Sequence, residues 1–369
     1  MLWAGPAILV SAIAIAWAAE SAQFFIAQGF ALAILAWLQT LPEFAVEAVL
    51  AWHQQVQFLL ANLTGALRLL TGFGWPVIYC TAAMFQRRRG GAPLKVIQLE
   101  NHHAVEVLGL AVPLLYVGVI AWKGSLTVYD SAVLILLYTA YLVILSRMPA
   151  EGPETIEDLE AIPRKIVTSP RALRISTIIG LFVLGGILIY VAAEPFLASL
   201  LALSIAAGIP AFVFIQWVAP VVSEFPEMAS TFYWARSVDR APMALMNMVS
   251  SNINQWTLLA AMLPIVLSFS VGAATPILFD QEQRVELLLT LGQAVIGIIF
   301  LMSMRFTWYE AAIMFVFFWI PFVHASLVKP VTMLYFAWAT LEMGRMFAGR
   351  RKLLAPAHFA RIWKDHIIR

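Results

Sequence analysis

Long apolar runs separated by short polar stretches occupy the chain from one end to the other. A helix needs about 20 mostly apolar residues to cross the hydrocarbon core of a bilayer, and these runs are close to that length or longer. None of them alternates apolar with polar residues as the strands of an outer-membrane barrel do. The pattern predicts helices in eleven runs, at residues 2–18, 21–51, 56–85, 105–122, 128–145, 175–192, 197–234, 243–269, 287–304, 311–328 and 331–347.

Composition narrows the class of protein. Of the 369 residues, 62% are hydrophobic and 12% are charged, whereas an ordinary soluble domain carries about 25% charged residues. This excludes a soluble globular protein and leaves no room for a large soluble domain. The net charge of +2 does not favour nucleic-acid binding, and the single cysteine excludes an internal disulfide. We expect an all-α polytopic membrane protein in direct contact with the lipid bilayer.

The distribution of Lys and Arg predicts the orientation of the chain. No Lys or Arg precedes Arg68, so the N-terminus is expected outside and the first run is expected to remain as a helix. Most basic residues then follow the third, fifth, seventh and ninth runs, on the cytoplasmic side. The basic C-terminal segment is cytoplasmic only if the eleventh run crosses. The chain is expected in a bacterial-type inner or plasma membrane.

One long polar stretch, residues 149–174, divides the runs into two groups of five. Because five is odd, the second group must enter the membrane in the opposite sense to the first. We expect a first repeat at 1–148, a linker at 149–174, an inverted second repeat at 175–328 and a C-terminal helix with a basic tail at 329–369. The linker is acidic in its first half and basic in its second. It is interpreted as a solvated cytoplasmic segment, with a regulatory cation sensor as the alternative.

A short motif occurs once in each half. Residues 40–45 read TLPEFA and residues 224–229 read EFPEMA, and Asn62 and Asn247 follow the two Pro-Glu pairs at nearly the same interval. Inverted repeats of this kind place broken helices at the bilayer midplane, where carboxylates and freed carbonyls can hold a cation. Each proline frees a backbone carbonyl about one turn earlier. The alternative is that each Pro-Glu pair is a helix terminus in the headgroup region.

Polar residues cluster around the second motif. Glu224 and Glu227 are three residues apart and can share one helix face. On the next helix a polar stripe consists of Asn247, Ser251, Asn254 and Gln255. Carboxylates inside a membrane are expensive and usually functional, so these residues are candidates for a cation site. Hydrogen bonding between helices is the alternative explanation of the stripe.

The two blocks resemble the alpha repeats of the sodium/calcium exchanger (cation/calcium antiporter) superfamily. The family pattern is Gly-[Ser/Thr]-[Ser/Thr]-x-Pro-Glu followed by Gly-Asn-x-x-Gly-Ser-Asn-Ile-x-[Asn/Asp]. Here the second repeat reads VSEFPE at 222–227 and MNMVSSNINQ at 246–255, and the first reads LQTLPE at 38–43 and ANLTGALRLL at 61–70. The resemblance implies two inverted five-helix repeats with an additional C-terminal helix.

The resemblance also implies the roles of individual residues. It makes Glu43 and Glu227 the central carboxylates that bind a metal cation, and Thr40, Ser223 and Ser251 hydroxyl ligands. Glu224 occupies a hydroxyl position, and Gln255, beside Asn254, occupies the distal acid or amide position. The first repeat departs from the pattern, since Ala66 and Leu70 replace ligands. Arg68 is expected to pair with Glu43, to reach the membrane surface or to contact a lipid phosphate.

The resemblance implies a secondary active transporter, not an enzyme, that exchanges Ca²⁺ or another small cation for Na⁺ or H⁺ by alternating access. Small inorganic cations are then its transported ligands, and no cofactor is expected. One alternative is a divergent homologue without calcium transport, either proton-coupled or a noncatalytic membrane partner. An intramembrane enzyme would need a metal cluster, for which His102, His103, Glu100 and Glu106 are candidates; a solvated interfacial pair is the simpler interpretation. Glu310 and Glu342, near helix ends, are expected to be solvated.

Overall fold

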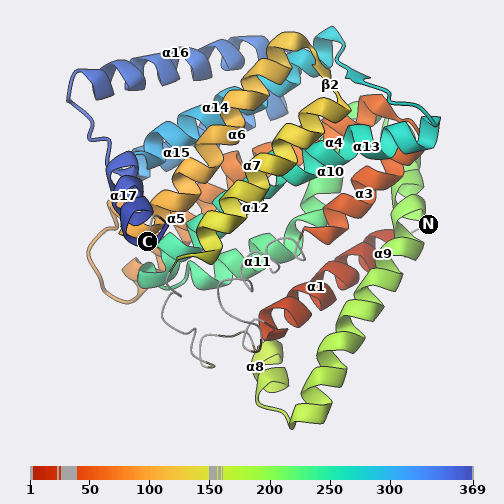
Figure 1. Ribbon diagram of the computed structural model, residues 1–369, viewed down its shortest axis with the longest axis horizontal. Coiled ribbons are helices and arrows are strands. Elements are labelled where there is room, and N and C mark those ends of the chain that lie inside the picture. The colour runs from red at the N-terminus through yellow and green to blue at the C-terminus, as the bar shows by residue number, and fades with distance from the viewer. Residues whose placement is uncertain are drawn as a thin grey trace.

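The computed structural model describes residues 3–22, 25, 40–148, 156, 159 and 161–367. Helices fill almost all of these ranges and pack into one bundle, with α1, α8 and α9 along one side of it in Figure 1. Most of the predicted run 21–51 and most of the acidic half of the predicted linker lie outside the described residues.

The structure describes six α-helices in the first half of the chain, up to the linker. Their bounds are α1 Ala4–Ala22, α3 Leu41–Trp52, α4 Val56–Arg68, α5 Trp75–Arg88, α6 Ala104–Lys123 and α7 Val128–Ser146. The π-helical segment η2, Leu69–Gly74, joins α4 to α5, so one helical path runs from Val56 to Arg88. The short elements are the strands β1 Val96–Gln98 and β2 Ser125–Leu126 and the 3₁₀ helix η3 Asn101–His103.

After α8 Ala161–Val167, the second half repeats the order of the helices described in the first half, with α10 as an additional helix. Its helices are α9 Arg171–Ala207, α10 Ala211–Ser223, α11 Phe225–Trp234, α12 Ala241–Asn254, α13 Ala260–Val271, α14 Gln281–Leu301 and α15 Trp308–Val323. The short elements are η5 Val238–Arg240, η6 Gln255–Leu259, η7 Ala325–Leu327, β3 Ile277–Leu278 and β4 Arg305–Thr307. The π-helical η6 joins α12 to α13, as η2 joins α4 to α5. The chain ends with α16 Val328–Phe347, α17 Ala355–Ile362 and η8 Trp363–Ile367.

Two small antiparallel sheets show that the two halves are inverted and joined. β1 pairs with β4 and β2 pairs with β3, so each sheet takes one strand from each half. β1 and β3 precede the equivalent helices α6 and α14, whereas β2 and β4 precede α7 and α15. The pairing is therefore reciprocal, as expected for two halves related by a two-fold axis. Because α6 lies between β1 and β2, the two sheets join the halves at its opposite ends.

Within the described residues, seven helical stretches are long and apolar enough to cross a membrane. They are Ala4–Ala22, Val56–Arg88, Asn101–Lys123, Val128–Ser146, Arg171–Ala207, Val238–Val271 and Gln281–Leu301. Together with the shorter apolar helices α10 and α15, they form the predicted all-α polytopic architecture. The eleventh predicted run is a helix, α16, but it is not one of these seven stretches.

One predicted helix boundary is wrong. The break expected between residues 192 and 197 does not exist, because α9 continues through Pro195 to Ala207. An interior proline removes only one helical donor, and membrane helices tolerate this loss. The helix ends instead at Gly208, whose φ of +67° suits glycine, and Pro210 then precedes α10. The run predicted at 197–234 consequently comprises the end of α9, all of α10 and all of α11.

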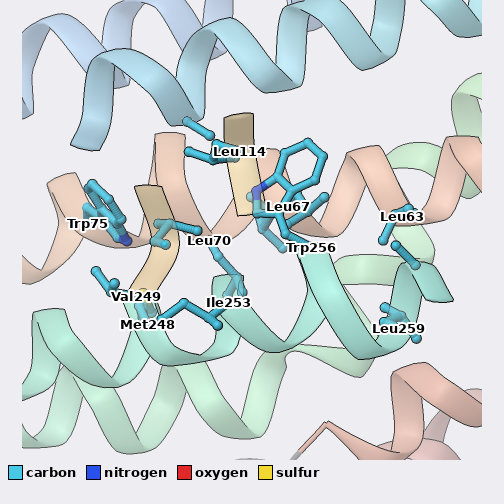
Figure 2. Close-up of a cluster of buried hydrophobic side chains, with 14 of the residues drawn as sticks. Leu63, Leu67, Leu70, Trp75, Leu114, Met248, Val249, Ile253, Trp256 and Leu259 are labelled. Atoms are coloured by element: carbon cyan, nitrogen blue, oxygen red, sulfur yellow. The ribbon is translucent and has the colours of Figure 1, made fainter. Parts of the chain in front are cut away.

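The centre of the bundle is the packing between the two π-interrupted helices. In Figure 2, Leu67 and Leu70 from the first of them lie beside Trp256 and Ile253 from the second, and Trp75 lies near Val249. Trp75 and Trp256 are among the largest fully buried side chains of the described chain. Burying such apolar side chains contributes about 1.5–3 kcal/mol each where water is the reference, but lipid offers less. Close packing therefore holds the two repeats in register.

At Gly65 the backbone of α4 lies very close to the backbone of α10. A Cβ at this position would lie 2.0 Å from the carbonyl oxygen of Gln216, far inside any normal contact. Only glycine lets the two backbones come this near. This crossing brings α10, and the helix break at its end, against the first half of the chain.

Candidate functional site

Three glutamates from three different helix ends meet inside the bundle. Glu43 lies in the first turn of α3, Glu224 lies at the break between α10 and α11, and Glu227 lies in the first turn of α11. They are 1%, 2% and 4% exposed. The carboxyl of Glu224 is within hydrogen-bonding range of both others. No ion pair among the described residues neutralises any of the three.

The local sequence explains why these side chains lie at helix starts. A proline within the first two positions of α3 and of α11 suits the opening turn of a helix and stops it from extending backwards. The unpaired N–H groups of a helix start form the positive end of the helix dipole, which favours a negative side chain there. The structure places both Pro-Glu pairs at helix termini, and the glutamate of each pair is buried inside the bundle.

The polar stripe on the second long helix connects the glutamates. Gln255 Nε2 donates to Glu43 Oε2 and to Glu224 Oε1, each at 2.8 Å. Asn254 Nδ2 donates to Thr40 Oγ1 at 2.5 Å, and Ser251 Oγ donates to Glu227 Oε1. Gln255 begins the π-helical segment η6, and such segments change the direction of side chains within a helix. One helix of the second half therefore reaches both halves of the site.

Seven of the eight residues predicted for the site lie together in this network. They are Glu43, Glu224, Glu227, Thr40, Ser251, Asn254 and Gln255. The eighth, Ser223, is buried but donates to the carbonyl of Ala219 at 3.2 Å, within its own helix. Asn247, the first residue of the stripe, lies 3.5 Å from the hydroxyl of Thr231 instead.

Several oxygens in this network have no donor. Within the described part of the chain, no hydrogen bond reaches Glu43 Oε1, Glu227 Oε2, Asn254 Oδ1 or Gln255 Oε1, and all four atoms are buried. A buried polar atom without a partner costs about 1–3 kcal/mol, so such atoms call for an explanation. Carboxylate and amide oxygens are the ligands that hard cations prefer.

The described residues contain no group of three or more His, Cys, Asp or Glu side chains arranged to hold a metal ion. In the site above, Gln255 and Ser251 donate to the carboxyl groups that would be needed. The chemistry of the oxygens thus suits a hard cation, whereas their present arrangement is held by amide and hydroxyl donors. Rotation of the Gln255 amide would exchange its donor for its carbonyl oxygen.

One buried glutamate on the same helix as Glu43 was not among the predicted site residues. Glu47 is 0% exposed, and its Oε1 accepts a 3.0 Å hydrogen bond from Asn62 Nδ2. The sequence signal was available, because Glu47 follows Glu43 by one helical turn and must share its face of α3.

The expectations for Arg68 are wrong. Its guanidinium does not pair with Glu43 or extend to the membrane surface, but lies 2.9 Å from Glu286 Oε2 on α14. Gln216 donates to the same carboxylate at 3.1 Å, and the guanidinium lies 4.9 Å from the ring centroid of Trp217. The reason is tertiary: α10 and α14 both pack on α4, and they bring a carboxylate to a residue that has none nearby in sequence.

The expectation that Glu310 and Glu342 are solvated is also wrong. They are 0% and 2% exposed, and both bind Arg351, which follows α16 and is itself 6% exposed. Burial acts to lower the pKa of Arg351, but the two carboxylates outweigh it and hold that pKa above its ordinary value. The C-terminal segment folds back onto the ends of α14 and α15, where Leu354 N also donates to Met302 O.

The histidine pair does not form the cluster that an intramembrane enzyme would need. His103 Nδ1 accepts from the backbone N–H of Glu100 at 3.2 Å, which caps the 3₁₀ turn η3. His102 lies 3.7 Å from the Glu100 carboxylate, with its ring packed against that of His103. Among the described residues these side chains do not form a metal-binding group.

Comparisons with known proteins agree with this architecture. The family model described as sodium/calcium exchanger protein matches residues 2–147 and 177–327. The crystal structure of the H⁺/Ca²⁺ exchanger CAX is 29% identical with a TM-score of 0.88, over 98% of this chain and 89% of that one.

Two further solved structures share the fold. The sodium-calcium exchanger NCX_Mj is 17% identical with a TM-score of 0.55, over 87% of this chain and 96% of that one. The structure of native YfkE is 15% identical with a TM-score of 0.58, over 86% and 88%. No curated protein matches the sequence.

Proposed function

This chain belongs to the sodium/calcium exchanger protein family, a family of secondary transporters that exchange cations, and on that premise we propose that it exchanges Ca²⁺ for H⁺ across its membrane by alternating access. The observation that carries the proposal is the contact among Glu43, Glu224 and Glu227, three buried carboxyl groups without a basic partner among the described residues. The similarity to an H⁺/Ca²⁺ exchanger over 98% of the chain supports the choice of ions.

Electrostatics explains how such a cluster exchanges a divalent cation for protons. Three carboxylates this close in a low-dielectric interior repel one another and cannot all stay ionised unless positive charge joins them. A divalent cation supplies that charge in one loaded form, and protons supply it in the other. The same oxygens thus bind the two ions alternately, because ligands must lose protons before they bind a metal.

We assign the central metal-binding roles to Glu43 and Glu227. Glu224 adds a third carboxylate, and Gln255 adds its carbonyl oxygen once its amide has rotated. Asn254, Thr40 and Ser251 complete the expected set of oxygens, while Ser223 would have to turn away from Ala219 to take part. Ca²⁺ takes about six to eight oxygens, a number this set can reach with bidentate carboxylates or water.

The proposal includes the membrane arrangement. Residues 1–148 and 175–328 form the two inverted repeats, 149–174 form a cytoplasmic linker, and 329–369 form the C-terminal helix and basic tail. The distribution of basic residues supports an outside N-terminus and a cytoplasmic C-terminus in a bacterial-type inner or plasma membrane. Small cations and lipid are the expected partners of this transporter, which we do not expect to be an enzyme or to need a cofactor.

The test is a flux measurement on purified protein reconstituted into liposomes. A pH gradient imposed across the liposome membrane should drive radioactive calcium uptake while a dye inside records protons moving the opposite way. A Na⁺ gradient of equal size should drive little uptake. Apparent Ca²⁺ affinity should rise with pH, because protons compete for the same carboxylates.

Two results would contradict the proposal. Calcium flux that is driven by Na⁺ and does not depend on pH would show that H⁺ is not the counter-ion. The protein could also show neither Ca²⁺-dependent nor proton-dependent flux although its helix content and thermal transition are intact. That result would show that the proposed activity is wrong.

A further inference from the structure

Glu47 and Asn62 form a buried polar pair beside the three-carboxyl cluster. Glu47 is on α3, one helical turn from Glu43, and Asn62 is on α4, which packs against α3. The pair is 0% and 1% exposed. Asn62 Nδ2 donates to Glu47 Oε1 at 3.0 Å. Among the described residues Glu47 is hydrogen-bonded to Asn62 and not to Glu224 or Glu227, so it is a separate group with its own partner.

Each member of this pair retains one oxygen without a donor. Among the described residues, no hydrogen bond reaches Glu47 Oε2 or Asn62 Oδ1, although both atoms are buried. Both atoms are acceptors, so they cannot satisfy each other as they stand. A proton on Glu47 Oε2 would make that atom a donor, and Asn62 Oδ1 is an acceptor on the side chain that Glu47 already contacts. In the side-by-side arrangement of a carboxylic acid–amide dimer, the acid O–H would donate to the amide oxygen while the amide N–H donates to the acid carbonyl, and both deficits would be removed.

Resting on the Ca²⁺/H⁺ exchange proposed above, we propose that Glu47 is a proton-binding residue of this exchanger, separate from the central cluster and paired with the amide of Asn62. The protonated side chain is neutral, which suits its complete burial. Its proton is released to water as H⁺, leaving the carboxylate, when a cation binds at Glu43 one turn away. Residues four apart on a helix have Cβ atoms about 5–6 Å apart, so the two sites are close enough to be coupled electrostatically.

The equivalent position in the second half has no titratable group. Thr231 follows Glu227 by one turn as Glu47 follows Glu43, and it lies 3.5 Å from Asn247, the counterpart of Asn62. The same pair of positions is thus a carboxyl–amide pair in one half and a hydroxyl–amide pair in the other. The two-fold related backbone therefore carries this proton site on one side only.

Few charged groups lie on the helices packed against α3, which carries Glu47. The elements packed on α3 are α1, α4, α9, α10 and α13, and the sequences of α10 and α13 contain no charged residue. The acidic groups are Glu43 on α3 itself, Glu224 beyond the end of α10, Glu20 on α1 and Glu194 on α9, which lies 3.6 Å from His53. The basic groups are Arg68 on α4, which is held by Glu286, and Arg171 and Arg174 at the start of α9.

The first test counts protons. Calcium is titrated into purified protein by calorimetry in two buffers of different ionisation enthalpy, which gives the number of protons released per Ca²⁺ bound. Glu47→Gln preserves the size of the side chain and its bond to Asn62, and it should release one proton fewer than the unmodified protein. Thr231→Val is the matched control at the equivalent position and should release the unmodified number.

The outcomes separate this inference from the proposed function. If the unmodified protein releases protons on binding Ca²⁺ and Glu47→Gln releases the same number, the role of Glu47 is overturned and the exchange proposal survives. If the unmodified protein binds no Ca²⁺ or releases no proton, the exchange proposal itself has failed.

Infrared spectroscopy gives a second readout that does not depend on transport. A protonated carboxyl has its own C=O stretching band, and calcium-free protein should show one that disappears in Glu47→Gln. Asn62→Leu keeps Glu47 but removes the amide, so the same band should move to higher frequency as its hydrogen bond is lost. No difference between either variant and the unmodified protein at this band would overturn the proposal.

Discussion

The two half-sites have the same backbone but different chemistry. In each half a short helix begins at a Pro-Glu pair and packs against a long helix with a π-helical segment. The second half supplies Glu224 and Glu227 together with Ser251 and Gln255, whereas the first half has Ala66 and Leu70 at the positions that correspond to Ser251 and Gln255. The loss is compensated across the interface, because Gln255 bonds Glu43 directly. Missing ligands in one repeat therefore do not imply a missing site when the other repeat can reach it.

The largest expected effect comes from removing charge at either half-site. Glu227→Gln should abolish Ca²⁺-dependent flux, a loss of at least about 100-fold, because a buried carboxylate neutralises part of the cation's charge at low dielectric. Glu43→Gln should match it if the half-sites contribute equally. The measurement is initial uptake into liposomes, with the exposed residue change Glu282→Gln as the control. Normal flux in Glu227→Gln would eliminate this site assignment.

The next effect tests a charge that is present in one half only. Arg68 corresponds to the buried apolar Ile253 when the halves are aligned on Asn62 and Asn247. Glu286→Gln leaves the Arg68 guanidinium buried without its carboxylate, which should destabilise the protein by about 3–5 kcal/mol. The thermal transition in detergent measures it. Adding Arg68→Met to Glu286→Gln should recover part of the loss, and an unchanged transition in the single variant would show that the pair is not stabilising.

A steric asymmetry gives a smaller effect on stability. Gly65→Ala places a Cβ 2.0 Å from the Gln216 carbonyl oxygen, so α4 and α10 must separate, at a cost of about 3 kcal/mol. At the corresponding position of the second half, Ser250→Ala removes only a 3.3 Å contact with the Tyr141 hydroxyl and should cost about 1 kcal/mol or less. The comparison of the two thermal transitions checks it. Equal shifts would mean that the close crossing is not special to the first half.

The smallest expected effect is on Ca²⁺ affinity. It distinguishes Ser251 from Ser223, which the family resemblance assigns the same role as hydroxyl ligands. Ser251→Ala removes the hydroxyl donor to Glu227 and should weaken apparent Ca²⁺ affinity about tenfold, equivalent to about 1.4 kcal/mol. Ser223→Ala removes a bond within its own helix and should change that affinity less than twofold. Calcium binding to purified protein at fixed pH measures both. A larger effect at Ser223 would mean that its side chain turns into the site when the cation binds.

Much of the architecture could be predicted from the sequence, because lipid imposes long apolar helices and the Pro-Glu motif occurs twice in one order. The boundary near Pro195 was not predictable by that logic. Proline signals a break in general, whereas the helix here continues and ends at a glycine with positive φ. The hydrophobic pattern identifies apolar segments, but it does not show whether the helix ends at Pro195 or at Gly208.

Residues of the candidate site that lie within the repeated motif could be predicted from the sequence. Contacts between residues that are distant in sequence could not. Glu43 and Glu227, each directly after a proline at a helix start, lie in one buried network with Glu224. Arg68 and Glu286 come from distant segments, and the residues around either one do not indicate that the two side chains pair. Glu310 was expected in water because it lies near a helix end, but Arg351 returns from beyond α16 to bind it. The sequence pattern also does not predict the direction of a side chain. Ser223, for example, donates to the Ala219 carbonyl of its own helix and not into the site.

The reciprocal pairing of the small strands has a consequence for biosynthesis. A ribosome makes β1 and β2 first, and their partners β4 and β3 emerge only with the second half of the chain. Until then the backbone groups at both ends of α6 lack their final hydrogen bonds, and the inserted first half is an open intermediate. The order of synthesis supplies β3 before β4, so the sheet with β2 can close first. Separate expression of the two halves should therefore yield little stable protein unless both are made together.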